Sequence, residues 1–260
     1  MTALPAAPAA PAAAHRSLRR LHRPALLVWA GFLLVMVGWL LWLHLSKVPT
    51  ERTCPGLHFD SEKYAADCGY SAFTDANNVF NFLGEALTYA CVAVAAWAGA
   101  ALVGRELESG TAKLAWTQSL SPARWLAGKL VAAALPLAAG GGLLALVFDL
   151  VWSSDKDWLV SNWTYDRVFI PRGPLLPALL LLGLAVGALA GIALQRTLPA
   201  LGAAAAVTLV TRLYLREAWQ QPRGPLHGFW TVHLLVTAMV LALAAAATVG
   251  AFCILRRRTR

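Results

Sequence analysis

Charged side chains are scarce in this chain of 260 residues, since Asp, Glu, Lys and Arg together make up only 13% of it. Water-soluble domains carry about 25% charged residues. Hydrophobic residues make up 58% of the chain, and the mean hydropathy is +0.59. The shortage of charge therefore argues against a soluble globular domain and favours residence in a membrane.

Acidic residues are the scarcer sign, with 13 Asp and Glu against 22 Lys and Arg, which gives a net charge of +9. A basic protein can bind nucleic acid, but here the bases do not cluster with aromatic residues on a soluble domain. They stand at the ends of apolar runs instead. This distribution is typical of contact with anionic lipid headgroups, so we predict membrane lipids and no nucleic acid as partners.

Catalytic motifs are also missing. The only Gly-Lys pair, Gly128-Lys129, has Ala123 where a P-loop needs its first glycine and Leu130 where it needs Ser or Thr. The sequence has neither the H-E-x-x-H pattern of zinc hydrolases nor the G-x-S-x-G pattern of serine hydrolases. We predict no catalytic residues, metal or cofactor, and any ATP-driven role would require a partner subunit.

Cysteine is rare, and two of the four cysteines, Cys91 and Cys253, lie inside apolar runs. Cys54 and Cys68 both fall in the segment after the first run, where an oxidising compartment would allow a disulfide. Such a bond would stabilise the loop by about 3 kcal/mol, and the alternative is two free thiols. Zinc is disfavoured because His58 is the only imidazole nearby.

Long apolar runs dominate what is present, and each can cross a bilayer as a helix. They lie at about Pro24–Leu45, Val79–Val103, Trp125–Trp152, Pro174–Leu194, Leu198–Leu215 and Phe229–Leu255. We predict an all-α, polytopic membrane domain of six spans over residues 24–255. Residues 1–23 are predicted to be a disordered tail with a basic flank, and residues 256–260 a basic end.

The bases are unevenly divided between the two ends of these spans. With the N-terminus inside, the inner segments hold thirteen bases against two acids, Glu106 and Glu108, whereas the outer segments hold nine of each. An excess of Lys and Arg marks the cytoplasmic side. We therefore predict a multi-pass protein of the cell's inner (plasma) membrane with both termini in the cytoplasm.

The link between the second and third runs, residues 104–130, is unusually polar: GRELESGTAKLAWTQSLSPARWLAGKL. Ser109-Gly110 is a helix stop, and Thr111 is suited to cap a short helix that runs to about Ser119. Ser121-Pro122 is a good start for the third span, and Lys129 is expected to reach back to the membrane surface. The link therefore predicts a helix lying across the cytoplasmic surface between two spans.

The order R-E-x-E-x-G-T, then T-Q-S-x-S-P-x-R-W and a Lys, resembles the loop between spans two and three in ABC transporter permeases of the type-two exporter family, most closely the small actinobacterial members. The resemblance covers the chain from about Arg16 to Arg260. It implies a permease that forms a homo- or heterodimer and is driven by a separate P-loop ATPase bound to this loop. The coupling residues that it implies are Glu106, Glu108, Gly110, Thr111, Ser121, Arg124 and Lys129.

Other features leave alternatives open. Glu85 is an acid inside the second span, where it either lines a translocation path or lies at the outer rim. Asp149 could pair with Arg212 across two spans. Gly183, Gly187 and Gly191 form a small-residue face for helix packing, within one subunit or between two.

Function follows as an expectation: the chain is the permease subunit of an ABC exporter, not an enzyme, and its cargo is not readable from the sequence. An ion-coupled secondary carrier, with Glu85 binding a proton, is the alternative transporter. A membrane anchor subunit without ATP coupling is a further alternative. The polar link itself could be an ordinary solvated loop, because Glu, Arg and Lys are common at membrane surfaces.

Overall fold

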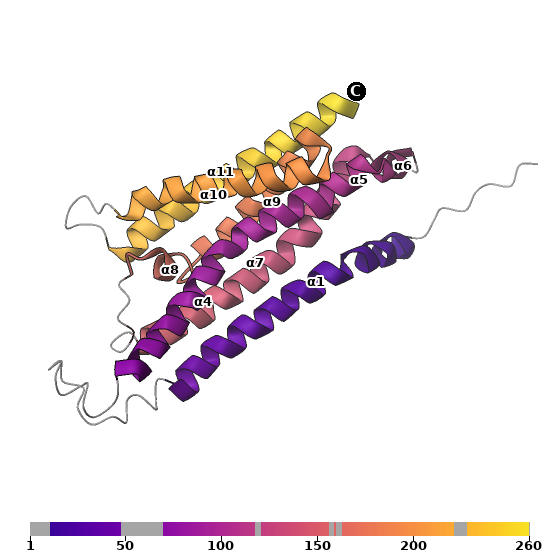
Figure 1. Ribbon diagram of the computed structural model, residues 1–260. Helices are drawn as coiled ribbons and strands as arrows, with labels where there is room; N and C mark the ends of the chain where they lie inside the picture. The colour runs from indigo at the N-terminus through magenta and orange to yellow at the C-terminus, as the bar shows by residue number, and fades with distance from the viewer. Residues whose placement is uncertain are drawn as a thin grey trace, which may run out of the picture.

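The computed structural model describes residues 11–47, 70–117, 121–155, 159, 163–220 and 228–259. Within these ranges every regular element is a helix, as predicted. Six helices in the described part of the chain are long and apolar enough to cross a membrane, so the protein is an all-α, multi-pass membrane protein. Figure 1 shows the helices running side by side along one direction.

Each predicted run coincides with one long helix, together with any π-helical turn that continues it. The long helices are α1 (Pro11–Trp42), α4 (Tyr70–Trp97), α7 (Pro122–Asp155), α9 (Leu175–Leu194), α10 (Thr197–Gln220) and α11 (Phe229–Thr259). The short elements are η1 (Leu43–Lys47), η2 (Ala98–Gly104), α5 (Arg105–Glu108), α6 (Thr111–Thr117) and α8 (Asp166–Phe169). The first helix differs from expectation, because α1 begins at Pro11, within the segment expected to be a disordered tail.

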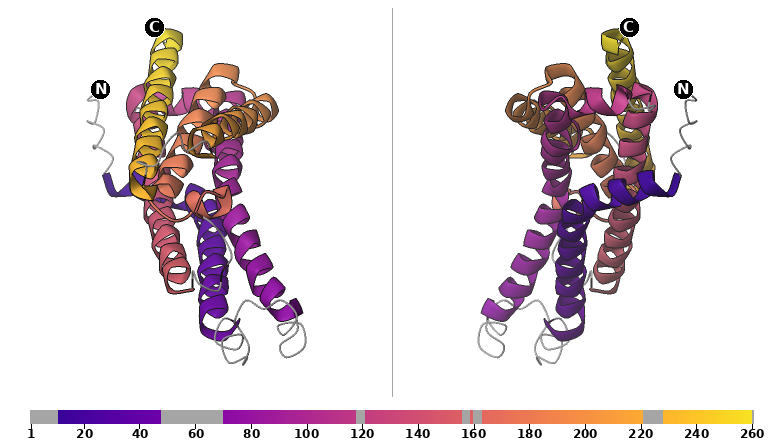
Figure 2. Two further views of the ribbon diagram at one scale, coloured as in Figure 1. Left: turned by 90° about the vertical axis from the view of Figure 1, so that its left-hand side faces the viewer. Right: turned by 90° about the vertical axis from the view of Figure 1, so that its right-hand side faces the viewer.

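The first helix is bent and projects from the rest. Figure 2 shows the N-terminal part of α1 turned away from its remainder, and Pro24 lies inside the helix. A proline inside a helix removes one backbone hydrogen bond and favours a bend. Figure 2 also shows that α1, α4 and α7 extend beyond α9, α10 and α11 at the end away from the C-terminus.

Helix α9 is the centre of the bundle. The apolar window of this helix is 78% buried, against 17% for α1 and 22% for α11. It contacts α4, α7, α10 and α11. A helix that is apolar all round, as Leu175–Leu194 is, is stable in such an enclosed position.

The glycine face of α9 packs within the subunit, which resolves the alternative left open by the sequence. A Cβ placed on Gly183 would lie 2.4 Å from the carbonyl oxygen of Cys91, and one on Gly187 would lie 2.5 Å from that of Ala95. Only glycine permits this approach of α9 to the backbone of α4.

Glycines in α7 serve the same purpose while its helix continues unbroken from Pro122 to Asp155. A Cβ on Gly140 would lie 2.7 Å from the indole nitrogen of Trp29, and one on Gly141 would lie 2.7 Å from a methyl carbon of Leu180. The indole of Trp29 also donates a 3.0 Å hydrogen bond to the carbonyl of Pro136, which joins α1 to α7.

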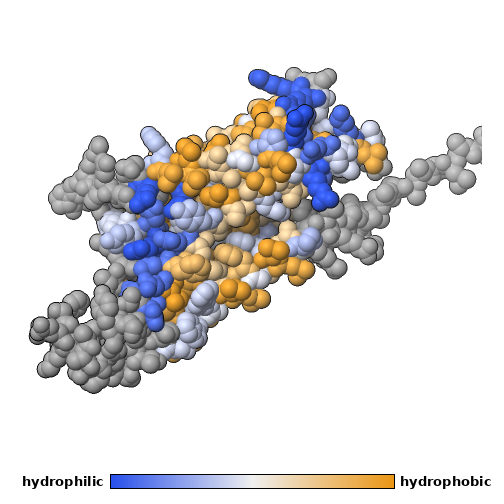
Figure 3. All heavy atoms as spheres, in the orientation of Figure 1, coloured by the Kyte–Doolittle hydropathy of each residue, from blue (hydrophilic) through white to orange (hydrophobic). Residues whose placement is uncertain are grey.

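Polar residues gather at the two ends of the bundle and leave an apolar band between them, as Figure 3 shows. This is the surface expected of a protein whose middle faces hydrocarbon. One end carries α8, and the other carries α5, α6 and the C-terminal end of α11 (Figure 1). The second of these is called the basic end below, after Arg105, Lys113, Arg124, Arg196 and Arg256–Arg258.

The α8 end is held by ion pairs that the sequence did not predict. Asp149 pairs with Arg172 at 2.8 Å, so the predicted Asp149–Arg212 pair is wrong. Arg212 instead lies 3.3 Å from Asp166 at the start of α8, a short helix that packs against α4. His44 Nδ1 also lies in hydrogen-bond contact with Asp155 Oδ2 at 2.7 Å, which joins η1, the continuation of α1, to α7.

Candidate coupling site on the basic face

The segment between the second and third spans begins as a direct continuation of α4. The chain passes through the π-helical turn η2 into α5 and stops at Gly110, which has φ +74°. This left-handed conformation suits glycine, so Ser109-Gly110 is the helix stop that the sequence predicts. Helix α6 then runs from Thr111 to Thr117, and residues 118–120, including Ser119, lie outside the described residues.

Thr111 stabilises this turn differently from the expected cap. Its hydroxyl donates to the carbonyl of Glu106 at 3.3 Å, at the end of the helix before it. The backbone amide of Lys113 donates a hydrogen bond to the Gly110 carbonyl at 3.0 Å. Thr111 therefore ties α6 back to α5 and does not cap α6 through its side chain. Ser121 does act as predicted, because its hydroxyl accepts the amide of Arg124 at the start of α7, at 3.4 Å.

Lys129 is buried and does not reach the membrane surface, since only 4% of the residue is exposed. Its Nζ donates to Glu106 Oε1 at 2.5 Å and to the carbonyl of Leu102 at 3.1 Å. The expectation that Lys129 extends to the headgroups is therefore wrong, because both acceptors lie close to it on η2 and α5. The ammonium joins α7 to the end of the second span.

Glu108 makes the corresponding link to the fifth span. Its Oε2 accepts the backbone amide of Thr197 at 2.9 Å and also accepts the Thr197 hydroxyl. Thr197 is the first residue of α10, whose N-terminal amides lack partners within the helix. A carboxylate at a helix N-terminus is also favoured by the helix dipole. Glu108 therefore caps α10 from outside its own helix.

Arg258, near the end of α11, completes this arrangement. Its guanidinium donates to the carbonyls of Ile192 and Ala193, both at 2.8 Å, in the last turn of α9. A cation there complements the negative end of the helix dipole. The tight α9–α10 turn, with Gln195 at φ 54°, is thus held by an acid on one side and a base on the other.

The remaining polar groups of the segment face outwards. On α6, Lys113 and Thr117 are exposed, and Leu114 is 62% exposed. Arg124 is exposed at the start of α7. The other face of α6 is fixed, since the ring of Trp116 meets that of Trp125 edge-on with centroids 5.7 Å apart. Two faces result, one packed on the bundle and one open.

The other candidate residues lie elsewhere. Glu85 is exposed on α4, next to Gly84, where a Cβ would lie 2.1 Å from the carbonyl of Arg167 in α8. Glu85 is therefore far along α4 from the α5–α6 segment. Cys54 and Cys68 lie outside the described residues. Among the described residues, no group of three or more His, Cys, Asp or Glu side chains is arranged to hold a metal ion.

Sequence reasoning missed Thr197 and Arg258 as partners of the site. A signal for Thr197 was present, because Gln195-Arg196-Thr197 is a minimal link and Thr is a frequent helix start. For Arg258 the sequence indicates a basic end in contact with lipid headgroups, whereas its contact with α9 depends on where α11 ends. No local pattern encodes that relationship.

The helical bundle and its polar ends define an α-helical, multi-pass membrane protein, and comparison with known families makes the class specific. Residues 25–221 match the family described as ABC-2 membrane transporter related. This match covers most of the chain, which therefore belongs to that family and is a membrane subunit of the ABC transporter type. No curated protein and no solved structure was found to match it.

Proposed function

We propose that this protein is the permease subunit of an ATP-driven exporter and that a separate P-loop ATPase binds the α5–α6 segment. The observation that carries the proposal is the pair of links through Glu106 and Glu108, which join this segment to α7 and α10. A segment fixed to two further spans can transmit a displacement to them. A solvated loop needs neither link, so the ordinary-loop alternative leaves both carboxylates unexplained.

The two acids and the open face have different tasks in this proposal. Glu106 and Glu108 bind Lys129 and Thr197, so they are positioning residues that transmit movement of the segment to α7 and α10. Leu114, with Lys113 beside it, is the exposed part of α6 and supplies the contact with the ATPase. An apolar side chain ringed by polar ones is typical of a protein contact.

The mechanical step follows from these contacts. When the ATPase binds ATP and its own subunits close, α6 moves with the surface to which it is docked. Trp116 transfers part of that movement to Trp125 of α7, and Glu106 transfers it through Lys129. Glu108 carries the movement to the start of α10. The third and fifth spans are thereby displaced relative to α9.

The proposed orientation places the basic end in the cytoplasm, where ATP is available. It is supported by the thirteen bases and two acids of the segments assigned to that side. Reaction of a cysteine placed at Ser121, in a variant whose four native cysteines are replaced by serine, with a membrane-impermeant maleimide tests it. Labelling in inverted vesicles but not in intact cells is the expected result, and the reverse pattern would refute the orientation.

Co-purification in mild detergent tests the partner. We expect a P-loop ATPase to co-purify with the wild-type chain and to be lost from Leu114→Glu, because a carboxylate would be buried in the contact. Arg257→Glu, a larger change of charge at the same end, is the matched control and should retain the ATPase. Retention by both variants would refute the docking site. Transport by the purified chain alone would refute the whole proposal and favour a secondary carrier.

A further inference from the structure

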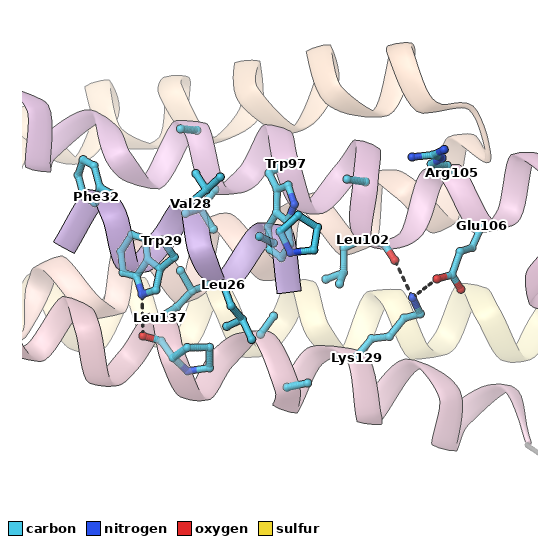
Figure 4. Close-up of a pocket in the computed structure, with 18 of the residues that line it drawn as sticks. Leu26, Val28, Trp29, Phe32, Trp97, Leu102, Arg105, Glu106, Lys129 and Leu137 are labelled. Carbon is cyan, nitrogen blue, oxygen red and sulfur yellow. Dashed lines mark hydrogen bonds and ion pairs between the residues drawn. The ribbon is translucent and has the colours of Figure 1, made fainter. Parts of the chain in front are cut away.

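A cavity of about 1090 Å³ lies between α1, α4 with η2, and α7. Figure 4 shows it as a long space with Trp29 and Phe32 toward one end and Lys129 and Glu106 pointing toward one another at the other. Leu26 and Val28, on its α1 wall, are 41% and 74% exposed, so the cavity adjoins the lipid-facing surface. Its volume reaches the upper end of the range for small-molecule sites, about 300–1,000 Å³.

The apolar part of the cavity has the length of one membrane leaflet. Its wall on α4 and η2 runs from Ala90 to Leu102, which corresponds to about 18 Å of helix, and its wall on α7 runs from Lys129 to Leu137, about 12 Å. Half of a bilayer's hydrocarbon core is about 15 Å thick. The space therefore matches the extent of an acyl chain that enters from one leaflet.

The two ends of the cavity differ in chemistry. Trp29, Phe32, Trp97 and Leu137 make the greater part apolar. The part of the cavity at the basic end of the bundle is lined by Arg105, Glu106, Ser109, Thr111 and Lys129. Glu106 neutralises one of the two cations, which leaves a net charge of +1 beside two hydroxyl groups. Such an end complements a negatively charged headgroup and is unfavourable for a second hydrophobic helix.

We infer that this cavity binds an anionic phospholipid from the leaflet at the basic end, with an acyl chain between α1, α4 and α7 and its headgroup against Arg105. Arg105 is exposed and can meet a phosphate at the headgroup level. Assignment of the site to the cytoplasmic leaflet rests on the orientation proposed above. The preference for an anionic phospholipid is independent of that orientation.

The occupant would link the weakly held first span to the bundle. Near the cavity, α1 is joined to α7 by the hydrogen bond from Trp29 to the Pro136 carbonyl. An acyl chain between the two helices adds apolar contact along the α1 wall, which runs from Pro24 to Phe32. Because Glu106 lines the cavity and also binds Lys129, the headgroup lies beside the ion pair that fixes α5.

Photocrosslinking of the full chain in phosphatidylcholine vesicles containing a little photoreactive phosphatidylglycerol, with a diazirine near the chain end, tests the site. We expect crosslinks on the cavity walls of α1, α4 and α7, and competition by unlabelled phosphatidylglycerol but not by added phosphatidylcholine. Ala132→Trp, which fills the cavity from an exposed position on α7, should lower labelling at least about tenfold. Ala206→Trp, at an exposed position on α10 away from the cavity, should leave it unchanged.

The charge requirement has its own variant. Arg105→Gln should lower the preference for phosphatidylglycerol about fivefold, the effect of about 1 kcal/mol for one base near a membrane surface. Arg257→Gln, at the same end but outside the cavity, should not. Equal labelling by a phosphatidylcholine probe, labelling that survives Ala132→Trp, or no labelling because a second copy of the chain fills the space would each overturn the inference. The readout needs no ATPase, so its failure is distinct from failure of the proposed function.

Discussion

Lys129 Nζ lies 2.5 Å from Glu106 Oε1 and 3.1 Å from the Leu102 carbonyl, so one buried ammonium joins α7 to both η2 and α5. An ion of this kind is stable only while its partners remain in place. The relationship makes the polar link between spans two and three a structural part of the bundle, and its consequences can be measured.

Removal of one member of this pair should destabilise the protein. Lys129→Met leaves the Glu106 carboxylate without its cation. We expect the free energy of unfolding, measured in sodium dodecyl sulfate, to fall by about 3 kcal/mol. This is at the low end for buried pairs because the Glu106 side chain keeps 20% exposure. The double variant Lys129→Met/Glu106→Gln should recover part of this loss. Glu106→Gln alone completes the cycle, and losses of the two single variants that simply add in the double variant would show that the pair is not coupled.

Loss of either carboxylate should uncouple transport from ATP hydrolysis. Glu106→Ala and Glu108→Ala each remove a link from the segment to another span, so the complex should insert and hydrolyse ATP while transport falls. Asp75→Asn, which removes one exposed acid at the far end of α4, is the control. Undiminished transport in both alanine variants would contradict the transmitting role.

The glycine face of α9 should tolerate no side chain. Gly183→Ala or Gly187→Ala would place a methyl group 2.4 or 2.5 Å from a carbonyl oxygen of α4, so the helices must separate, at a cost of about 1–3 kcal/mol. Gly202→Ala makes the same change where no atom lies within 4 Å and should be neutral or slightly stabilising. Thermal unfolding in detergent compares the three, and similar midpoints would be incompatible with the observed packing.

The role of Arg258 as a cap can be separated from a general need for basic charge. Arg258→Gln loses the charged bonds to Ile192 and Ala193, and we expect earlier thermal unfolding and faster proteolysis at the α9–α10 turn. Arg257→Gln removes the same charge from an exposed neighbour and should have little effect. If the two variants behave alike, lipid contact and not capping explains the basic end.

The spans and the helix stops could be predicted from the sequence because each depends on local composition. An apolar run long enough to cross a membrane must form a helix there, and Ser109-Gly110 and Ser121-Pro122 are read from residue type alone. Helix ends do not follow from composition, as α1 shows by beginning at Pro11, because helical hydrogen bonding continues past the apolar part of a run.

The partners of the charged residues could not be predicted, since they depend on how helices pack. Asp149 was expected opposite Arg212 from their similar depth, yet α8 inserts Asp166 beside Arg212 and leaves Asp149 to Arg172. Lys129 was expected at the surface from its position in the span, whereas its burial depends on the approach of η2. The position of a charged residue along its span follows from the sequence, but its partner depends on which helix packs against that side of the span.

The enclosure of α9 by helices of its own chain has a consequence for assembly. Because its glycine face is already occupied by α4, changes in α9 alter how well a single copy folds. The permease dimer that the family resemblance implies would then pair through the outer helices, of which α1 and α11 leave most of their apolar windows uncovered. Selective formation of mixed pairs should accordingly map to lipid-facing positions of the peripheral spans.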